Sequence, residues 1–396
     1  MTRMTVLASR APFLLPIAGA LIVGLLFLRK VPESGGEGIP EYIIKVNRGT
    51  GNLSPLVTLL KYPATLITLG LYGSGGLVGP LARIGAGAGS FLAEKILSPF
   101  KIATRSDIRT AAICGMSGTI SALFHAPLGG AFFAAEILKR DRMKYTDLFP
   151  AILSGSAAYA ISLYILRQQP IISITAPGIL VSATLVIWFL ISAIFCGAIG
   201  MLFIISFEKI AKLLRRLHGS QPLTALVGSI VPCALWLLKL DWSLGISSTL
   251  RTTILTNDIS HMAVPAFLQS NLVALFAAVI IIKIIATSFT IGSGMSAGFT
   301  GPLIIIGLSS GALIASLVGF EPGSPEYYAL LACGLPAALG AALNIPIAAI
   351  IISIKIFGVS YTLPALVSGI LAFLIYKAKT IYTLYLRPET GATDDL

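Results

Sequence analysis

Apolar residues recur in long blocks along almost the whole chain, separated by short polar connectors. The blocks cover residues 11–28, 56–72, 80–98, 110–137, 148–166, 171–207, 223–240, 264–291, 302–320, 327–343, 345–358 and 362–377. A helix needs about 20 apolar residues to cross a bilayer, so several blocks are too short or too interrupted to span. Those at 80–98 and 345–358 are interrupted by Gly and Pro at their starts, and we expect them to begin inside the bilayer. Only protein or a water-filled cavity can satisfy free backbone groups at that depth, so such broken helices indicate a transport pathway.

The composition assigns the chain to the membrane. Of its 396 residues 56% are apolar and only 11% are charged, with a mean hydropathy of +0.91. Soluble proteins carry charge on roughly a quarter of their residues, so this chain cannot cover its surface with polar groups. We expect an all-α, multi-pass integral membrane protein, which excludes a disordered chain, a disulfide scaffold and a large water-facing catalytic domain. Because Arg29 and Lys30 follow the first block in place of a cleavage site, we interpret it as a retained helix and not a signal peptide.

The basic residues indicate how the chain is oriented in the membrane and do not indicate a nucleic-acid partner. The net charge is +12, from 28 Lys and Arg against 16 Asp and Glu, which in a soluble protein would suggest nucleic acid. Here the basic residues gather in three connectors: Lys95, Lys101, Arg105 and Arg109; Lys139, Arg140, Arg142 and Lys144; and Lys209, Lys212, Arg215 and Arg216. We interpret these as cytoplasmic loops that follow the positive-inside rule and attract anionic membrane lipid. No nucleic-acid partner is expected.

The cysteines and histidines indicate neither a metal site nor a cofactor. The cysteines lie singly in apolar blocks, without CxxC spacing, and we expect them to be reduced core residues; they are Cys114, Cys196, Cys233 and Cys333. His218 lies in a basic connector and His261 in a polar loop. His125, just before Ala126-Pro127, is either a pH sensor or a helix-end histidine satisfied by backbone, and we favour the second interpretation.

The chain contains an internal duplication. Residues 114–137 read CGMSGTISALFHAPLGGAFFAAEI and align without a gap to residues 333–356, CGLPAALGAALNIPIAAIIISIKI, at an offset of 219. A second pair agrees at an offset of 222, with Gly79-Pro80-Leu81 matching Gly301-Pro302-Leu303. Duplicated membrane chains with interrupted helices at corresponding places are typical of transporters and channels. Their ion sites lie where the broken helices of the two halves meet.

Three glycine-rich stretches lead to a proline in the first turn of an expected helix: Gly35 to Pro40, Gly73 to Pro80 and Gly294 to Pro302. Pro after Gly in this position marks a helix N-terminus. A fourth segment, Tyr382-Thr383-Leu384-Tyr385, supplies hydroxyl groups. Free N–H groups and the positive end of the helix dipole hold a small anion without a full positive charge, which would bind it too tightly to conduct it. The sequence therefore predicts an anion pathway.

These residues resemble the helix-start motifs GSGIP, GREGP and GxFxP of the chloride channel (CLC) family. The corresponding stretches are Gly36-Glu37-Gly38-Ile39-Pro40, Gly76-Leu77-Val78-Gly79-Pro80 and Gly298-Phe299-Thr300-Gly301-Pro302. The resemblance continues through Arg109-Thr110 to residues 124–130, FHAPLGG, similar to the family's FNAPLAG, and it covers most of the chain. It implies a fold of two inverted repeats of tilted, partly re-entrant helices, and a homodimer with one pore in each subunit.

The resemblance also implies which residues bind the anion: Glu37, Gly38, Ile39, Gly76, Val78, Gly79, Phe299, Thr300 and Tyr382. Tyr382 matches the tyrosine whose hydroxyl coordinates the central anion. Thr300 stands where GxFxP has Phe, so we expect the backbone donors to persist without the ring.

Both proton-carrying glutamates of the family are replaced. Val78 occupies the place of the extracellular gating glutamate in GREGP, and Ile137, directly after the conserved Glu136, falls where transporting members carry an intracellular one. Neither Val nor Ile carries a proton. The gating and proton-pathway positions are therefore Glu37, Val78 and Ile137.

Glu37 replaces the coordinating Ser of GSGIP. At about 4 Å an ionised carboxylate and an anion repel by roughly 4 kcal/mol at an effective dielectric near 20, so an ionised Glu37 in contact with chloride would expel it. Three interpretations of its carboxylate remain. It faces a basic vestibule or solvent and is satisfied by the helix dipole, or it is protonated with a raised pKa. In the third, it occupies the site as a tethered anion that gates the pathway.

Two further charges lie inside apolar blocks. Glu136 and Lys355 are equivalent in the duplication, and we expect a structural salt bridge or separate interfacial anchors in preference to a role in transport. Lys283 either snorkels to the interface or adds positive potential near the pathway.

We predict a passive chloride channel and no enzyme, because the anion-binding helix starts persist while both proton carriers are lost. The alternative is a proton-coupled or gated exchanger that uses Glu37. A remote alternative is an intramembrane serine hydrolase built on Gly115-Met116-Ser117-Gly118, although Pro336 occupies the equivalent of Ser117 and no later apolar block holds a histidine.

The expected organisation has five parts. Residues 1–34 form an N-terminal helix and connector, 35–207 the first repeat, 208–222 a basic linker, 223–378 the second repeat and 379–396 a C-terminal segment with Tyr382. No nucleotide-sensing CBS domains follow. We expect the protein in a prokaryotic inner membrane.

Overall fold

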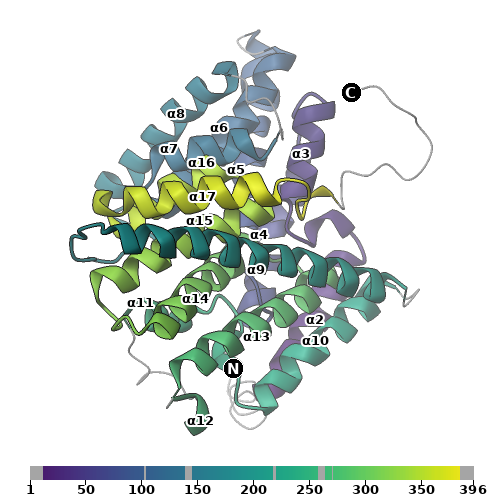
Figure 1. Ribbon diagram of the computed structural model, residues 1–396. Helices are drawn as coiled ribbons and strands as arrows, with labels where there is room; N and C mark the ends of the chain where they lie inside the picture. Colours follow the sequence, from purple (N-terminus) through teal and green to yellow (C-terminus); the bar gives the residue numbers. More distant parts are fainter. Residues whose placement is uncertain are drawn as a thin grey trace.

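The computed structural model describes residues 12–101, 104–138, 145–216, 220–256, 264–269 and 271–383, without the side chains of residues 105, 266 and 267. Within these residues the regular elements are the helices of Figure 1. One isolated β-bridge is also present. Predictions on the following residues lie outside the described part: Lys139, Arg140, Arg142, Lys144, His218, His261, Leu384 and Tyr385.

The described chain forms sixteen α-helices. Those of the first part are α2 (Leu15–Ile22), α3 (Ile39–Arg48), α4 (Pro55–Gly70), α5 (Val78–Phe91), α6 (Arg105–Phe124), α7 (Pro127–Glu136) and α8 (Tyr145–Ala160). Those of the second part are α9 (Ala183–Arg215), α10 (Gln221–Leu237), α11 (Ser248–Thr256), α12 (Ala266–Gln269), α13 (Leu272–Gly292), α14 (Thr300–Val318), α15 (Pro325–Leu343), α16 (Pro346–Phe357) and α17 (Thr362–Tyr376).

Six helical stretches of the described chain are long and apolar enough to cross a membrane. They are Tyr145–Ile165, Ala183–Arg215, Leu272–Gly292, Thr300–Val318, Pro325–Leu343 and Val359–Tyr376. The remaining helices are too short or too polar to meet that criterion, which agrees with the expected mixture of complete and broken helices. The all-α membrane fold class is confirmed.

Helix α15 forms the centre of the molecule. Every residue from Tyr327 to Leu343 is buried, so this helix is covered by protein on all sides. It packs against α9, α14 and α17, and α9 and α17 lie side by side across the middle of Figure 1. An apolar helix buried all round is a core element and not a lipid-facing one.

The duplicated segments form matching helices. Helices α5 and α14 begin at Val78 and Thr300, which are 222 residues apart. Helices α7 and α16 begin with Pro127 and Pro346, which are 219 residues apart. The two offsets of the sequence alignment thus reappear at the helix starts.

The two halves meet at Gly76 and Gly298, which are also 222 residues apart and form an antiparallel bridge. The Gly76 N–H donates to the Gly298 carbonyl at 2.9 Å, and the Gly298 N–H donates to the Gly76 carbonyl at 2.7 Å. Such a reciprocal pair in an antiparallel arrangement relates the two strands by a local two-fold axis. The equivalence of the two residues therefore confirms the expected inversion between the repeats.

Small residues allow the matching helices to approach equally closely in each half. A Cβ atom on Gly115 would lie 2.1 Å from the Gly85 carbonyl oxygen, and one on Gly334 would lie 2.1 Å from the Gly307 carbonyl oxygen. Glycine contacts of this kind bring membrane helices into backbone contact. They fix α5 on α6 and α14 on α15, and so set the direction of the helix starts at Val78 and Thr300.

One helix starts later than the sequence predicts. The apolar block at 171–207 is helical only from Ala183, because residues 168–182 include two prolines and run without regular structure along the protein surface. Ile171 donates to the carbonyl at the end of α6, at Leu123. Pro80 and Pro302 occupy the third position of their helices, within the first turn as expected.

Candidate functional site

The loop before α3 is shaped by two glycines. Gly36 and Gly38 have φ angles of 60° and 93°, and Gly38 directly precedes the first residue of α3. A Cβ atom on Gly38 would lie 2.6 Å from Cε of Lys61 and 2.8 Å from Cγ of Arg83. Glycine is therefore required at this turn for its left-handed backbone and for the close approach of two cationic side chains. The turn directs Glu37, which lies between the two glycines, into the protein.

Glu37 lies at the start of α14. Its side chain is 2% exposed, and its Oε1 accepts a hydrogen bond from the Phe299 N–H at 3.0 Å. Phe299 is the N-cap of α14, so the carboxylate lies on a free donor at the positive end of that helix. The interpretation of a carboxylate turned toward a basic vestibule or solvent is wrong.

The same side chain lies against the start of α5. A Cβ atom on Gly79 would lie 2.5 Å from Cγ of Glu37 and 2.8 Å from its Oε1. Gly79 is the second residue of α5, so only the absence of a side chain there leaves room for the carboxylate. The structure thus brings Glu37, Gly79 and Phe299 together, from three of the four segments that the sequence singled out.

Tyr382 completes the group. It is 2% exposed, and Ile381 before it donates to the Ala342 carbonyl near the end of α15 at 3.1 Å, which fixes this segment on the core. The Tyr382 hydroxyl acts on the Glu37 carboxylate as a hydrogen-bond donor that lowers the pKa of the carboxyl. All four expected segments therefore converge on one buried position.

Glu37 belongs to the loop outside the six spanning stretches, and its environment favours the neutral form. Burial raises the pKa of Glu37 to about 8, although the Phe299 N–H, the Tyr382 hydroxyl and the Lys61 charge each lower it. A carboxyl with such a pKa exchanges its proton in the physiological range. Two of the three interpretations of Glu37 therefore describe the two protonation states of one residue.

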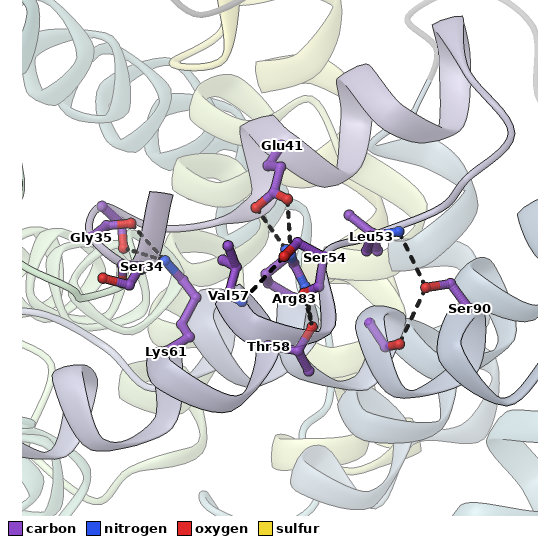
Figure 2. A network of polar contacts seen from close by, with 12 residues as sticks. Ser34, Gly35, Glu41, Leu53, Ser54, Val57, Thr58, Lys61, Arg83 and Ser90 are labelled. Atoms are coloured by element: carbon purple, nitrogen blue, oxygen red, sulfur yellow. Dashed lines mark hydrogen bonds and ion pairs between the residues drawn. The ribbon is translucent and has the colours of Figure 1, made fainter. Parts of the chain in front are cut away.

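Lys61 of α4 holds the loop from behind (Figure 2). Its Nζ is buried and donates to the carbonyl oxygens of Gly35, Gly36 and Ser34 at 2.6, 3.1 and 3.3 Å. The ammonium group thus fixes the turn and supplies a positive charge close to the buried carboxylate.

Arg83 of α5 forms a second buried support in the same network (Figure 2). It is fully buried, and its guanidinium makes two hydrogen bonds of 2.8 Å to the Glu41 carboxylate and one of 2.8 Å to Thr58 Oγ1. A two-pronged Arg–carboxylate pair is rigid and neutral overall. It joins α3, α4 and α5 behind Gly38. Lys61, Arg83 and Glu41 were not predicted from the sequence, although charges within apolar helices are a signal for such a role.

Two cavities are lined by residues next to this group. The first, of about 230 Å³ and called here the Arg251 cavity, is lined by Gly76, Leu77, Val78, Phe124, Ile171, Ile172, Ile246, Arg251, Gly301, Ile304 and Ile305. The second, of about 400 Å³ and called here the Arg215 cavity, is lined by Leu28, Pro32, Gly35, Gly36, Phe207, Ala211, Arg215, Gln221, Thr224, Ile291, Gly292, Ser293 and Gly294.

Val78 and Glu37 are each next to one of the cavities. Val78 is 3% exposed and lines the Arg251 cavity, and it directly precedes Gly79, which faces the Glu37 side chain. Gly36, directly before Glu37, lines the Arg215 cavity. The two cavities share no lining residue.

Thr300 stands where the motif GxFxP has an aromatic ring, and the neighbouring Phe299 has a ring that packs against other aromatic side chains. Its ring meets the rings of Phe207 and Phe203 edge to face, with centroids 4.7 and 5.9 Å apart. Thr300 is fully buried, and its Oγ1 has no hydrogen bond within the described chain. The Phe299 backbone donor is in place and is engaged by Glu37, whereas the N–H and the carbonyl of Gly76 are both used in the bridge to Gly298.

Glu136 has a different role from the one expected. Its two carboxylate oxygens accept hydrogen bonds from the N–H groups of Ile347 and Ala348, at 3.1 and 2.9 Å, at the start of α16. Lys355 lies nine residues further along, near the end of that helix. The predicted Glu136–Lys355 salt bridge is therefore wrong, and Glu136 caps a helix of the other repeat. Ile137, directly after it, is 6% exposed and ends α7.

His125 ends α6 with a φ of 51°, and its equivalent Asn344 ends α15 with a φ of 62°. The helix-end position is thus as expected, but the histidine is not satisfied by backbone. Its Nε2 is buried without a hydrogen bond to the described residues, and its ring meets Tyr159 edge to face at 5.4 Å. Burial, and then the charge of Lys355, lower the pKa of His125.

Lys283 and Ser117 are both engaged inside the protein. Lys283 is fully buried and donates to the Ser243 carbonyl and Ser247 Oγ at 3.0 and 2.7 Å, so it does not snorkel to the interface.

Ser117 of the Gly-x-Ser-Gly motif is fully buried and donates to the Ala151 carbonyl at 2.7 Å. That hydroxyl bonds no histidine among the described residues, so it forms no catalytic pair with His125.

Comparison with known proteins agrees with the helix arrangement. Residues 19–377 match the family model of the voltage gated chloride channel. The chain is 26% identical over 379 residues to a chloride/fluoride channel protein of Pseudomonas syringae, which covers 93% of this chain and 77% of that protein. It is 25% identical to the H(+)/Cl(-) exchange transporter ClcA of Salmonella paratyphi A, over 88% of this chain and 72% of the relative.

Solved structures show the same fold. The crystal structure of a CLC-type fluoride/proton antiporter superposes with a TM-score of 0.80 at 21% identity, and the match covers 95% of this chain and 88% of that one. At this identity the likeness is one of fold alone.

Proposed function

The chain belongs to the chloride channel (CLC) family of membrane anion channels and transporters, and on that premise we propose that it is a passive, chloride-conducting channel gated by the carboxyl of Glu37. The contact between Glu37 Oε1 and the Phe299 N–H supports this proposal most directly. It puts a negatively charged side chain where the helix starts offer donors to a permeating anion.

The anion site has the properties that conduction requires. Backbone N–H groups at the starts of α5 and α14, together with the Tyr382 hydroxyl, attract an anion through partial charges. Lys61 acts only from behind the loop, where three carbonyls accept hydrogen bonds from its Nζ. An anion is therefore held weakly enough to leave again.

Glu37 and a permeating anion compete for the same donors. Their repulsion at about 4 Å is roughly 4 kcal/mol at an effective dielectric near 20, so both do not occupy the site together. The pathway opens when the carboxyl is protonated or swings away. In this chain the gate approaches from the α3 loop, whereas the residue on α5 is Val78.

Passive transport follows from the two aliphatic replacements. Val78 and Ile137 carry no proton, and Glu136 beside Ile137 is engaged by two N–H groups of α16. No described carboxyl therefore replaces the second proton carrier next to α7. Net flux then follows the electrochemical gradient of the anion.

Proton-coupled exchange through Glu37 alone is the second candidate, and one observation favours it. Glu37 is a buried carboxyl whose pKa of about 8 allows it to bind and release a proton as the anion leaves and enters. In this case one residue would carry both the gate and the proton.

A vesicle experiment separates the two candidates. The purified protein is reconstituted with equal chloride on both sides and a pH gradient across the membrane, and chloride movement is recorded. A passive channel moves no chloride uphill, whereas an exchanger accumulates it. Uphill movement that is lost in Glu37→Gln and kept in Glu33→Gln would replace the channel proposal by the exchanger. Glu33 is a suitable control because it is exposed and only four residues away.

We also infer that two subunits pair, each with its own pathway. Large apolar side chains remain exposed on α8 and at the start of α17, among them Phe149 at 67% and Leu363 at 44%. Such a surface fits either lipid or a second copy. Cross-linking in native membranes at these helices would give a dimer band.

A further inference from the structure

The segment that carries Tyr382 is joined to α9 by an ion pair. Lys379, which precedes Tyr382 on the same short stretch beyond α17, donates from its Nζ to Oε2 of Glu208 at 2.6 Å. The Glu208 side chain is 11% exposed and that of Lys379 is 38% exposed. A hydrogen bond between two charged groups is shorter and stronger than one between neutral groups. The pair therefore connects the C-terminal stretch to the last turns of α9.

Between the ion pair and Tyr382 the chain forms a tight turn. The Tyr382 N–H donates to Oγ1 of Thr380 at 3.1 Å, and Thr380 directly follows Lys379. The Ile381 N–H donates to the Ala342 carbonyl at 3.1 Å. This one backbone bond to α15 still allows the stretch to pivot, and the ion pair removes that freedom. Two anchors together therefore fix the direction of the tyrosine side chain.

Phe207, directly before Glu208 on α9, supports a second part of the site. Its ring packs edge to face on the ring of Phe299 with the centroids 4.7 Å apart, and both side chains are buried. The Phe299 N–H is the donor to Oε1 of Glu37. Two neighbouring residues of α9 thus support two donors of that carboxyl, one through an aromatic contact and the other through the ion pair.

We propose that the Glu208–Lys379 ion pair positions Tyr382, and that breaking the pair withdraws its hydroxyl from the gate carboxyl of the α3 loop. The inference rests on the proposed function, because it assigns the residues that orient one donor of the gate. Neither residue of the pair binds the anion, and both act through the tyrosine. Since the hydroxyl stabilises the ionised carboxyl, the intact pair favours the closed gate.

The ion pair consequently sets the pH at which the gate opens. The Tyr382 hydroxyl lowers the pKa of Glu37, against the larger effect of burial. When the hydroxyl is withdrawn, the carboxyl keeps its proton to a higher pH. Lys61 and the Arg83–Glu41 pair are the other charged groups that the described chain places around this loop, and a change in the ion pair leaves them where they are.

Lys379→Met tests the pair through the pH dependence of chloride flux into vesicles. The midpoint lies near pH 8 in the wild type. We expect it to move up by about one pH unit, which corresponds to one hydrogen bond to a charged group. Glu208→Gln breaks the same bond from α9 and should give the same shift, while Lys379→Arg keeps the pair and the midpoint. Lys209→Met, an exposed change next to Glu208, is the control without effect.

A double variant distinguishes positioning from a general loss of stability. Tyr382→Phe should raise the midpoint as far as Lys379→Met does. The two changes combined should add nothing further, because both remove the same hydrogen bond. If the shifts are additive, or if Lys379→Met leaves the midpoint unchanged while Tyr382→Phe moves it, the inference fails and the gate stands.

Crystal structures of the full chain separate these results from a failure of the proposed function. We expect Tyr382 to lie away from Glu37 in Lys379→Met and to keep its place in Lys379→Arg. If the wild-type flux does not depend on pH, the titrating gate is wrong, but a displaced tyrosine in Lys379→Met still supports the positioning role. A tyrosine that stays on Glu37 in Lys379→Met would overturn the inference whatever the flux.

Discussion

The carboxylate of Glu37 accepts a hydrogen bond from the N–H of Phe299 across 262 positions of the chain, at 3.0 Å. This one contact joins the loop before α3 to the start of α14 and so connects the two repeats at the anion site. It also changes which chemical group the loop places at the anion site. A position where the family motif has a serine here carries a carboxyl, which competes with the anion when it is ionised.

Replacing Glu37 by Gln should increase chloride flux at pH 9 by about tenfold or more, because the fraction of molecules with an open site limits transport. The neutral amide keeps the size of the side chain and removes the competing charge. Efflux from chloride-loaded vesicles measures the effect. Glu33→Gln, an exposed change in the same stretch, should leave the rate unaltered, and a slower Glu37→Gln would show that the carboxylate assists conduction.

The flux should depend on pH through Glu37. With a pKa of about 8, the carboxyl is neutral at pH 6 and ionised at pH 10. Chloride flux therefore rises as the pH falls through about 8, and in Glu37→Gln it stays flat over the same range. A wild-type flux that is constant from pH 6 to pH 10 would be incompatible with a titrating gate.

The same pKa predicts how stability depends on pH. The folded value of about 8 lies above the ordinary 4.5 of a glutamic acid, so between these limits the folded protein keeps a proton that the unfolded chain has lost. The stabilisation is complete at low pH and is lost as the pH rises through about 8. Thermal unfolding in detergent should show this loss in the wild type and a smaller slope in Glu37→Gln.

Lys61→Met should destabilise the protein by about 2–4 kcal/mol. The change leaves the carbonyls of Ser34, Gly35 and Gly36 without their donor and removes the charge behind Glu37. The midpoint of heat-induced loss of the monodisperse peak in size-exclusion chromatography checks this. Lys95→Met is the control, since the Lys95 side chain is 57% exposed. Equal midpoints for the two variants would show that the loop does not depend on Lys61.

The two glycines beside Glu37 form a matched pair for mutation. Ala at Gly38 meets Lys61 and Arg83 below 3 Å and must adopt a φ of 93°, whereas Ala at Gly36 meets no atom within 4 Å and has only its φ of 60° to accommodate. Gly38→Ala should therefore cost about 3 kcal/mol and Gly36→Ala about 1 kcal/mol. Chloride flux and thermal midpoint together measure both effects, and a reversed order would contradict the described packing.

The sequence allowed the fold and the place of the site to be predicted, because both depend on local signals. Glycine and proline mark the starts of α5, α14 and α16, and the duplication repeats them at nearly constant offsets. An inverted pair was implied only by family resemblance. The Gly76–Gly298 bridge now gives its structural basis.

The partners of the charged residues were beyond sequence reasoning. Arg83 lies 42 positions from Glu41, and Glu136 lies more than 200 positions from the helix start that it caps. Neither pairing follows a helical or strand period, because each depends on how separate helices cross. The same is true of Glu37, whose direction is decided by two left-handed glycines and by the space at Gly79.

The most direct test of whether Glu37 occupies the anion site is the position of bromide in crystals grown at pH 9, compared between the wild type and Glu37→Gln. If the carboxyl occupies the anion site, bromide should lie on the Phe299 N–H and beside Tyr382 only in the variant. Bromide at that position in the wild type, with the Glu37 side chain still bonded to Phe299, or an empty position in the variant, would contradict it.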